Sequence, residues 1–405
     1  MKKILIGIFA MMAWTFVSCD KDDSDPEDPT AERTVLIYMA AQNNLTYDNY
    51  YGKRYAKYDL DEIKQAIPQL GNDHLVIYVD KAKDPNSSYD DHNPYLLHYR
   101  NGELRDSIPM DSTAIPCDPA TMTSVIKRAF TDYPAKDYGL VLWGHGSGWQ
   151  IFKDSIATYT ARQRAYGGSN TSNSYVGTGN KWMNIPTLAK VLKTLPNRLK
   201  FIFADCCNMM CAECAYELKD VCDYFIGSAA EIPGNGAPYD QVVPAMMEKE
   251  TFYQSICDKY AAKYNDCIPL AVVKSSEMVQ LADATMKVLQ ATKAADNLAQ
   301  YPNLRNIIYY LDKNLYDINH FIKTYATESE YNSWKQALDK AIVYKKFAKY
   351  WTTMSHVNFL DFDMNEENFS GMSMFVPQWG LQNTDNKNIK LFGWYYAAGY
   401  DTIEW

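Results

Sequence analysis

The sequence predicts an α/β protein with a mostly parallel central sheet, and three observations support this class. Apolar runs that resemble buried strands alternate with stretches of helical spacing, beginning with 34–40, 60–70 and 74–79. Two later runs, at 138–143 and 200–204, end abruptly in polar or reactive residues, as strands do where a parallel sheet borders a ligand site. The chain of 405 residues is 47% hydrophobic and 22% charged, a composition typical of globular rather than disordered proteins.

The first half of the chain contains the elements of a parallel sheet and then a long polar loop. After the βαβ unit over 34–79, we expect a hairpin strand at 95–99, a helix at 119–130 with proline in its first turn, and a buried strand at 138–143. Residues 150–181 are rich in Ser, Gly, Asn and Thr, and a structureless loop of this length is usually functional. Because it directly follows His145, it is predicted to be an active-site loop.

The second half continues this alternation and then becomes mostly helical. We expect a helix at 185–195, a strand at 200–204, a helix at 208–221, strands at 224–228 and 270–274, a helical pattern from 279 to 350, and late strands at 359–362 and 372–376. Neither a Walker loop nor a dinucleotide-binding glycine fingerprint is present in the sequence. The predicted division is a core domain at 33–278 and a helical C-terminal part at 279–405 that packs on it.

The first residues have the pattern of an export signal. Lys2 and Lys3 precede an apolar run that is short for a membrane-spanning helix and that ends in Val17-Ser18-Cys19. This end resembles a bacterial lipobox, so residues 1–18 are predicted to be a signal peptide and Cys19 a lipid-modified residue. A plain cleaved signal is the alternative.

An acidic, proline-rich segment follows the predicted lipidation site. Residues 19–32 have the composition of a flexible tether. Their acidic start resembles the surface-export signal of lipoproteins in the Bacteroidetes group. The expected location is therefore the outer membrane, on the cell surface, with a lipid anchor.

The charge balance bears on the class of partner. A net charge of −9, from 49 acidic and 40 basic residues, argues against a nucleic-acid partner. It is compatible with a basic ligand, although most acidic surfaces serve solubility. The 32 tyrosines keep a glycan-binding surface lipoprotein open as an alternative function.

The ends of two predicted strands carry residue types that suit acyl transfer. His145 lies between two glycines after one strand, and Cys206 and Cys207 follow the other. If the strands are neighbours, a thiol and an imidazole meet at one rim as nucleophile and general base. The helix predicted to begin at 208 would favour the thiolate through its N-terminal partial positive charge. Gly146 and the cysteine's own amide are the candidate oxyanion donors.

Other interpretations of these residues remain open. A histidine beside a glycine is more often structural than catalytic. Besides Cys19 there are eight cysteines, of which five lie within 206–222, so they form a poor disulfide framework. Four of these could in principle form a Cys₄ metal site: Cys206, Cys207, Cys211 and Cys214. Enclosure of a metal from a single strand–helix corner is difficult. The favoured interpretation is that Cys211, Cys214 and Cys222 are small apolar residues of a helix, and no metal is expected.

Four segments resemble the clostripain-like cysteine peptidases, a family related to caspases and gingipains. They are Val35 to Leu45, similar to the family's opening strand; Trp143 to Trp149, similar to its histidine motif; Asp205 to Leu218, similar to its Asp-Ala-Cys motif and following helix; and Ser370 to Pro377, similar to its late Ser-Gly-Leu-Ser motif. The resemblance covers most of the chain after residue 33.

The resemblance implies a caspase-like α/β/α sandwich and a Cys–His dyad that cleaves after Arg or Lys. The register of Glu213 to Leu218 places Cys207 on the family's nucleophile and Cys206 on its alanine. His145 falls on the general base. Asp205 falls on the aspartate that receives a basic side chain, and its alternative role is a turn anchor or helix cap.

The resemblance also implies possible activation by self-cleavage between His and Cys. Arg162, Arg164 and Lys181 are candidate cleavage sites, although a solvated loop charge is the better interpretation of any single one. No cofactor is expected, because no compact calcium loop is present in the sequence, but calcium dependence is compatible with the resemblance. The alternatives to a peptidase are an inactive relative that only binds peptides and the glycan-binding lipoprotein.

Overall fold

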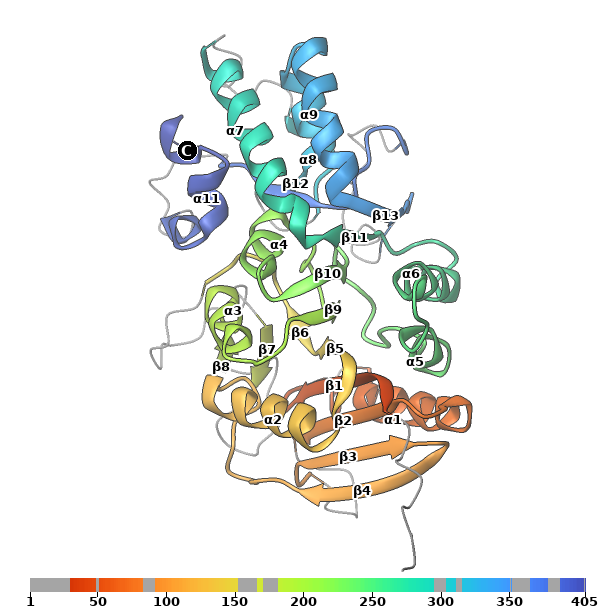
Figure 1. The fold of residues 1–405 in the computed structure, drawn as a ribbon. Helices are drawn as coiled ribbons and strands as arrows, with labels where there is room; N and C mark the ends of the chain where they lie inside the picture. Colours follow the sequence, from red (N-terminus) through yellow and green to blue (C-terminus); the bar gives the residue numbers. More distant parts are fainter. Residues whose placement is uncertain are drawn as a thin grey trace, which may run out of the picture.

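The computed structural model describes residues 30–48, 51–82, 92–151, 166–169, 181–294, 304–310, 315–349, 351, 365–377, 387–403 and 405. A nine-stranded sheet forms their centre (Figure 1). Its strands are β1 (Ala31–Ala41), β2 (His74–Lys81), β3 (Tyr95–Arg100), β4 (Glu103–Pro109), β5 (Ala135–Trp143), β9 (Leu199–Asp205), β10 (Cys222–Gly227), β11 (Leu270–Lys274) and β13 (Ile342–Lys346). Their spatial order is β13-β11-β10-β9-β5-β1-β2-β3-β4.

The middle of the sheet is parallel and its margins are antiparallel. β10, β9, β5, β1 and β2 run in one direction, while β3, β4, β11 and β13 pair antiparallel with their neighbours. The prediction of an α/β protein with a mostly parallel sheet is therefore confirmed. All parallel strands end at the same edge, which is where ligands bind in such sheets.

Helices cover both faces of the sheet (Figure 1). α1 (Tyr55–Ala66), α5 (Tyr239–Met246) and α6 (Phe252–Lys263) lie on one face, and α2 (Pro119–Asp132), α3 (Ile185–Lys193) and α4 (Ala212–Leu218) lie on the other. The residues of β1 alternate between the two cores: Val35 and Ile37 belong to the first, Leu36 and Tyr38 to the second. Because both faces are covered, the parallel strands are apolar without a polar side.

Local sequence explains where the helices begin. Asp118 caps α2, since its carboxylate accepts the backbone N–H groups of Ala120 (2.9 Å) and Thr121 (3.2 Å), and Pro119 occupies the first turn. Thr327 and Glu330 form a capping box at the start of α9 (Glu328–Ala341).

The C-terminal part of the chain shares the central sheet. It contains α7 (Met278–Ala294), β12 (Leu315–Asp317), α8 (Ile318–Tyr325), α9, β13, β14 (Ser373–Phe375) and α11 (Gly393–Ala397). The short 3₁₀ helices of the described chain are η1 (Ile67–Gln69), η2 (Ser275–Glu277), η3 (Leu304–Asn306), η5 (Asn388–Leu391) and η6 (Tyr400–Thr402). β13 forms the sheet edge beside β11, and β14 pairs with β12. The backbone N–H of Ser373 donates to the carbonyl of Met210 (3.0 Å), so this part also contacts the segment after β9.

Three predicted elements differ from the structure. The helix expected from 208 begins only at Ala212, because Asn208 has a left-handed backbone (φ 58°) and its N–H donates to the carbonyl of Ala230 (3.0 Å). The loop expected at 150–181 contains β7 (Tyr166–Ser169), which pairs with its neighbours in a small three-stranded sheet. The helical pattern over 279–350 is interrupted by β12 and β13, which tertiary pairing holds as strands.

Some predictions concern residues outside the described part. The signal peptide at 1–18, Cys19, residues 20–29 of the tether and the strand at 359–362 belong to this group. The predicted end of the tether at 32 is wrong, because Ala31 and Glu32 already belong to β1. Among the residues that the structure describes, no helix combines the length and apolar character needed to cross a membrane.

Candidate active site

The two reactive strand ends are neighbours. β5 and β9 pair in parallel, with Trp143 opposite Asp205. His145 and Cys207 each follow two residues later, at the carboxyl edge of the sheet. The sequence-based prediction that an imidazole and a thiol share one rim therefore agrees with the topology.

The two segments contact each other through their backbones. A methyl group added at Gly146 would lie 2.7 Å from the carbonyl oxygen of Cys207, and one at Gly148 would lie 2.6 Å from that of Asn208. Real side chains do not tolerate such distances, so only glycine allows this approach. The glycines after His145 thus bring its segment directly against the cysteine turn.

His145 is held in place by its neighbours in the small sheet. It forms β6 (His145–Gly146), which pairs antiparallel with β7, and β7 pairs with β8 (Lys181–Met183). His145 is half-buried, and its Nε2 lies 2.8 Å from Oδ1 of Asn44. If the amide oxygen accepts from Nε2–H, the neutral ring carries its lone pair on Nδ1. Asn44 therefore holds the imidazole in one orientation through Nε2.

A second asparagine fixes the strand that supports His145. Asn43 is fully buried, and its Nδ2 donates to the carbonyls of Gly167 (3.0 Å) and Gly168 (2.8 Å) on β7. It also donates to the carbonyl of Ala40 (2.9 Å). These bonds attach β7 to the end of β1, next to the histidine.

Sequence reasoning noted Asn43-Asn44-Leu45 only as the end of a strand and assigned neither asparagine a role. Their position after a buried parallel strand was the available signal, because the carboxyl end of β1 borders the same edge as β5.

Cys207 is partly exposed at the start of a tight turn. The backbone N–H of Ile232 donates to its sulfur (3.4 Å), and the thiol lies 3.8 Å from the Ile232 carbonyl. The N–H group of Ile232 favours the thiolate, whereas donation by the thiol to the Ile232 carbonyl favours the protonated form, so these contacts position the sulfur. These contacts replace the helix N-terminus that the sequence predicted beside the cysteine, since α4 begins only at Ala212.

The neighbouring cysteine is in a different environment. Cys206 is fully buried, and burial raises the pKa of its thiol well above the ordinary value, with the nearby Cys207 and Asp205 adding to the effect. A buried protonated thiol is a poor nucleophile. Of the two adjacent cysteines, only Cys207 has access to a substrate.

Asp205 is buried under the turn that follows β10. Its Oδ2 accepts the N–H of Ala237 (3.1 Å) and the hydroxyl of Tyr239 (2.8 Å), and its Oδ1 accepts the hydroxyl of Tyr260 (2.8 Å). Burial raises the pKa of this carboxyl, and the three hydrogen bonds partly offset that rise. Asp205 therefore anchors the 232–237 turn, the same turn whose Ile232 contacts Cys207.

The remaining predicted residues are placed as follows. Lys181 begins β8, and its carbonyl accepts from the thiol of Cys117 (2.9 Å). Arg162 and Arg164 lie outside the described residues, as does Cys19. Within the described chain no group of three or more His, Cys, Asp or Glu side chains could hold a metal ion, and the eight cysteines there are all free.

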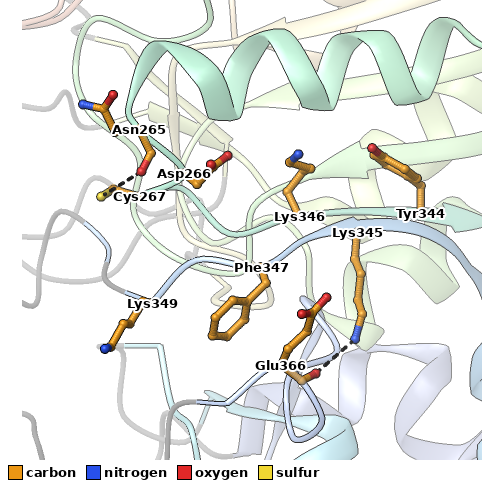
Figure 2. A pocket seen from close by; sticks show the side chains of 9 residues that line it. All are labelled: Asn265, Asp266, Cys267, Tyr344, Lys345, Lys346, Phe347, Lys349 and Glu366. Carbon is orange, nitrogen blue, oxygen red and sulfur yellow. Dashed lines mark hydrogen bonds between the residues drawn. The ribbon is translucent and has the colours of Figure 1, made fainter.

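A separate cavity lies at the edge of the sheet. Its volume is about 470 Å³, and it is bounded by the 265–267 turn, the end of β13 and Glu366 (Figure 2). Figure 2 shows Lys345 directed at the Glu366 carbonyl, to which its Nζ donates (3.5 Å). None of the predicted site residues lines this cavity.

Comparison with known proteins agrees with this arrangement. The model of the clostripain family matches residues 37–389. The structure of a secreted C11 cysteine protease from Bacteroides thetaiotaomicron, in complex with an irreversible peptide inhibitor, superposes with a TM-score of 0.71 at 25% identity, covering 92% of this chain and all (100%) of that one. An inactive zymogen C11 protease from Parabacteroides distasonis has a TM-score of 0.71 at 30% identity, covering 91% and 98%.

A third solved structure and a search of proteins with curated function were also compared. Another secreted C11 cysteine protease from Bacteroides thetaiotaomicron shares the fold, with a TM-score of 0.64 at 19% identity, over 91% of this chain and 99% of that one. Among proteins of curated function, none shows a significant match. The expected caspase-like α/β/α sandwich is confirmed. The chain belongs to the clostripain family of cysteine peptidases, enzymes whose substrates are peptides or proteins.

Proposed function

We propose that this peptidase hydrolyses the bond after Arg or Lys, with Cys207 as the nucleophile and His145 as the general base. The observation that carries the proposal is the contact between the two strand ends, where Gly146 lies against the carbonyl of Cys207. This contact brings a partly exposed thiol and an oriented imidazole to one rim.

The proposed reaction follows from this placement. His145 takes the thiol proton of Cys207, and the resulting thiolate attacks the substrate carbonyl carbon. The carbonyl oxygen becomes an oxyanion held by the N–H groups of Gly146 and Cys207. His145 then donates a proton to the leaving amine as the peptide bond breaks. A water molecule, deprotonated by His145, attacks the resulting thioester and releases the acid product and the thiol.

Asp205 is the proposed receptor of the basic side chain before the cleaved bond. It lies two residues before the nucleophile. Its Oδ1 accepts only from Tyr260 and can accept a further hydrogen bond, whereas Oδ2 already accepts from Ala237 and Tyr239. A buried carboxylate discriminates strongly against neutral side chains, because only a cation compensates its charge. The planar carboxylate of Asp205 would favour arginine over lysine, because its geometry matches that of the planar guanidinium.

Self-cleavage between His145 and Cys207 is proposed as the activating step. Arg162 and Arg164 precede β7, while Lys181 begins β8. A cut before β7 would leave that strand paired with His145, because Asn43 and the β6 pairing hold it. The similarity to a protein described as an inactive zymogen supports a latent form of this chain.

The proposed location is the outer membrane, through lipidation of Cys19. Support comes from the apolar run before Cys19 and from the similarity to proteins described as secreted. Metabolic labelling with an alkyne fatty acid tests it, and loss of label in Cys19→Ala is the expected result. Unchanged labelling of that variant would contradict it.

The decisive experiment is intact-mass analysis of the purified chain after incubation. Fragments that end at Arg162, Arg164 or Lys181 are expected, and they should be missing from a Cys207→Ala sample. Hydrolysis of peptide substrates that differ only in Arg, Lys or citrulline before the cut provides the second readout. Full hydrolysis by Cys207→Ala would overturn the assignment, and equal cleavage after citrulline would overturn the specificity.

A further inference from the structure

A second buried carboxyl group lies beside Asp205 and has no part in the proposed reaction. Asp59 faces the core from α1 and is 0% exposed. Trp143 Nε1 donates to its Oδ2 (2.6 Å). Its Oδ1 is buried and has no hydrogen-bond partner among the described residues. Such an oxygen costs free energy in a folded protein, so its presence calls for a functional reason.

Asp59 and Asp205 lie against the same glycine. A methyl group added at Gly236 would be 2.6 Å from Oδ2 of Asp205 and 3.3 Å from Oδ2 of Asp59. Gly236 has a left-handed backbone (φ 50°), so glycine is favoured here both by conformation and by space. The two carboxyl groups are therefore close neighbours under one turn, at the end of the strand that leads to Cys207.

Several titratable groups face this pair. They are Glu62 on α1, Tyr239 on α5, Tyr260 and Lys263 on α6, Tyr264 directly after α6, and Cys206 directly after β9. Lys263 Nζ binds Glu62 (3.1 Å) and the carbonyl of Asn235 (3.3 Å), so its charge is shared with Glu62 at the rim. The negative charge of Asp59 and Asp205 is less well compensated by Lys263 than that of Glu62.

Of the two carboxyl groups, Asp59 and Asp205, Asp59 is the one that is protonated. Burial raises the pKa of Asp59 well above its ordinary value, the neighbouring Asp205 raises it further, and the Trp143 bond only partly opposes this. Asp205 has three hydrogen-bond donors that stabilise its anion. Two carboxyl groups that share a site titrate as a pair, and the less solvated member keeps the proton.

We propose that Asp59 couples the binding of a basic substrate side chain at Asp205 to the release of a proton. This inference rests on the proposed function, since it assumes that Asp205 receives the side chain before the cleaved bond. With the subsite empty, Asp59 is a neutral acid. When a guanidinium or ammonium group enters, its positive charge stabilises the ionised form, the O–H bond of Asp59 breaks, and the proton passes to solvent.

The coupling selects for cations. A neutral side chain brings no charge to stabilise ionised Asp59. The proton therefore remains on Asp59, and the affinity for the neutral ligand does not increase. For a basic ligand, the affinity rises with pH by up to about tenfold per pH unit while Asp59 titrates. Asp59 is thus a specificity-determining residue that acts through the charge of the pair.

Calorimetry on the full-length Cys207→Ala variant tests the coupling. The probes are a peptide ending in arginine amide and the same peptide ending in citrulline amide, which has nearly the same shape without the charge. Titrations in phosphate and in Tris, between about pH 5 and pH 8, give the protons released per ligand. Release of up to about one proton is expected for the arginine peptide and none for citrulline.

Two further variants separate coupling from structure. Asp59→Asn in the same background should abolish proton release and the pH dependence of affinity, while thermal stability stays equal or rises because a buried acid is removed. Glu62→Gln is the matched control in the same cluster. It should retain proton release, displaced to lower pH, because the charge of Glu62 raises the pKa of Asp59. A lower melting temperature for Asp59→Asn with unchanged proton release would mean that Asp59 is only structural.

The outcomes distinguish this inference from the proposed function. Arginine binding without proton release overturns the coupling and leaves the Arg or Lys specificity standing. Equal affinity for the two peptides, together with equal hydrolysis after arginine and citrulline by the unmodified chain, overturns the specificity and the coupling with it.

Discussion

The two ends of the central sheet both carry histidines, in opposite environments. At the carboxyl end, His145 is half-buried beside a partly exposed thiol and contacts Asn44 through Nε2. Near the start of β2, His74 and His98 are both buried, and Nδ1 of His74 lies 2.8 Å from Nε2 of His98. The residue type is the same, but the surroundings differ.

The buried pair shows what a structural histidine looks like here. Nδ1 of His98 lies 3.2 Å from Asp106, so both of its ring nitrogens have partners, and the ring stacks on Tyr133 at 3.8 Å. Burial lowers the pKa of His98, and the bond to Asp106 only partly offsets this. A histidine held neutral with both nitrogens engaged cannot exchange protons with a substrate, whereas one at an open rim can.

The largest effect is expected from the two adjacent cysteines at the carboxyl end. Cys207→Ala should lower kcat by at least about 10³-fold, because the nucleophile is lost. The kcat of Cys206→Ala should stay within about threefold of that of the unmodified chain, since this thiol is buried and protonated. Steady-state hydrolysis of an arginine amide substrate measures both. Comparable losses for the two variants would mean that the register of the motif is misassigned.

The histidines provide the direct comparison between the two ends. His145→Ala should reduce kcat by roughly 10²- to 10⁴-fold, the range for loss of a general base. His98→Gln should leave kcat near that of the unmodified chain, because it lies at the other end of the strands. The same assay, with circular dichroism as a folding check, measures both. A large kcat loss in a folded His98→Gln protein would break the distinction drawn between the ends.

Asn44 sharpens the comparison by testing orientation alone. Asn44→Ala should lower kcat by about tenfold to a hundredfold with little change in KM, because the imidazole loses its 2.8 Å partner. Asn44→Asp keeps an acceptor oxygen, so it should restore most of the activity. Its carboxylate should also raise the pKa of His145 seen in the pH–kcat profile. An unshifted profile in Asn44→Asp would argue that this contact does not orient the catalytic ring.

A smaller effect is expected at the amino end, in stability rather than activity. The folded-state pKa of His98 is below its ordinary value of 6.5, so the unfolded chain binds the proton more readily. Stability from neutral His98 is therefore present above about pH 6.5 and is lost as the pH falls below it. The melting temperature of the unmodified chain should fall relative to that of His98→Gln by roughly 2 °C between about pH 7.5 and pH 5.5. Parallel pH curves for the two proteins would contradict this.

The smallest effect expected is that of metal removal. No cofactor takes part in the proposed reaction, so dialysis against EDTA should change kcat/KM by less than about twofold, within assay error. Restoration of a lost activity by calcium alone would reveal a metal requirement instead.

Much of the fold could be predicted from the sequence. The apolar runs of β1, β2, β5, β9 and β10 are long enough and rich enough in β-branched and aromatic residues to mark buried strands. The reactive residues at the ends of β5 and β9 followed from the same patterns. Element boundaries were less predictable: α4 begins at Ala212 rather than 208 because Asn208 and Met210 donate to carbonyls near the end of β10.

The contacts around the site depended on partners far apart in the chain. Asn44 meets His145 across 101 residues, and Tyr260 meets Asp205 across 55. Residues without a period or motif of their own, such as Asp59 and Ile232, become important only when the fold places them beside the site. No local pattern encodes such a placement.

The sequence by itself determined the parallel strands of the central sheet and the reactive side chains that follow them, because burial and periodicity act on neighbouring residues. The tertiary structure decided the strand order, the environments of Cys206 and Cys207, and the carboxyl pair under Gly236. These depend on the packing of distant segments, since desolvation and hydrogen bonds at each atom are set by whatever the fold brings against it.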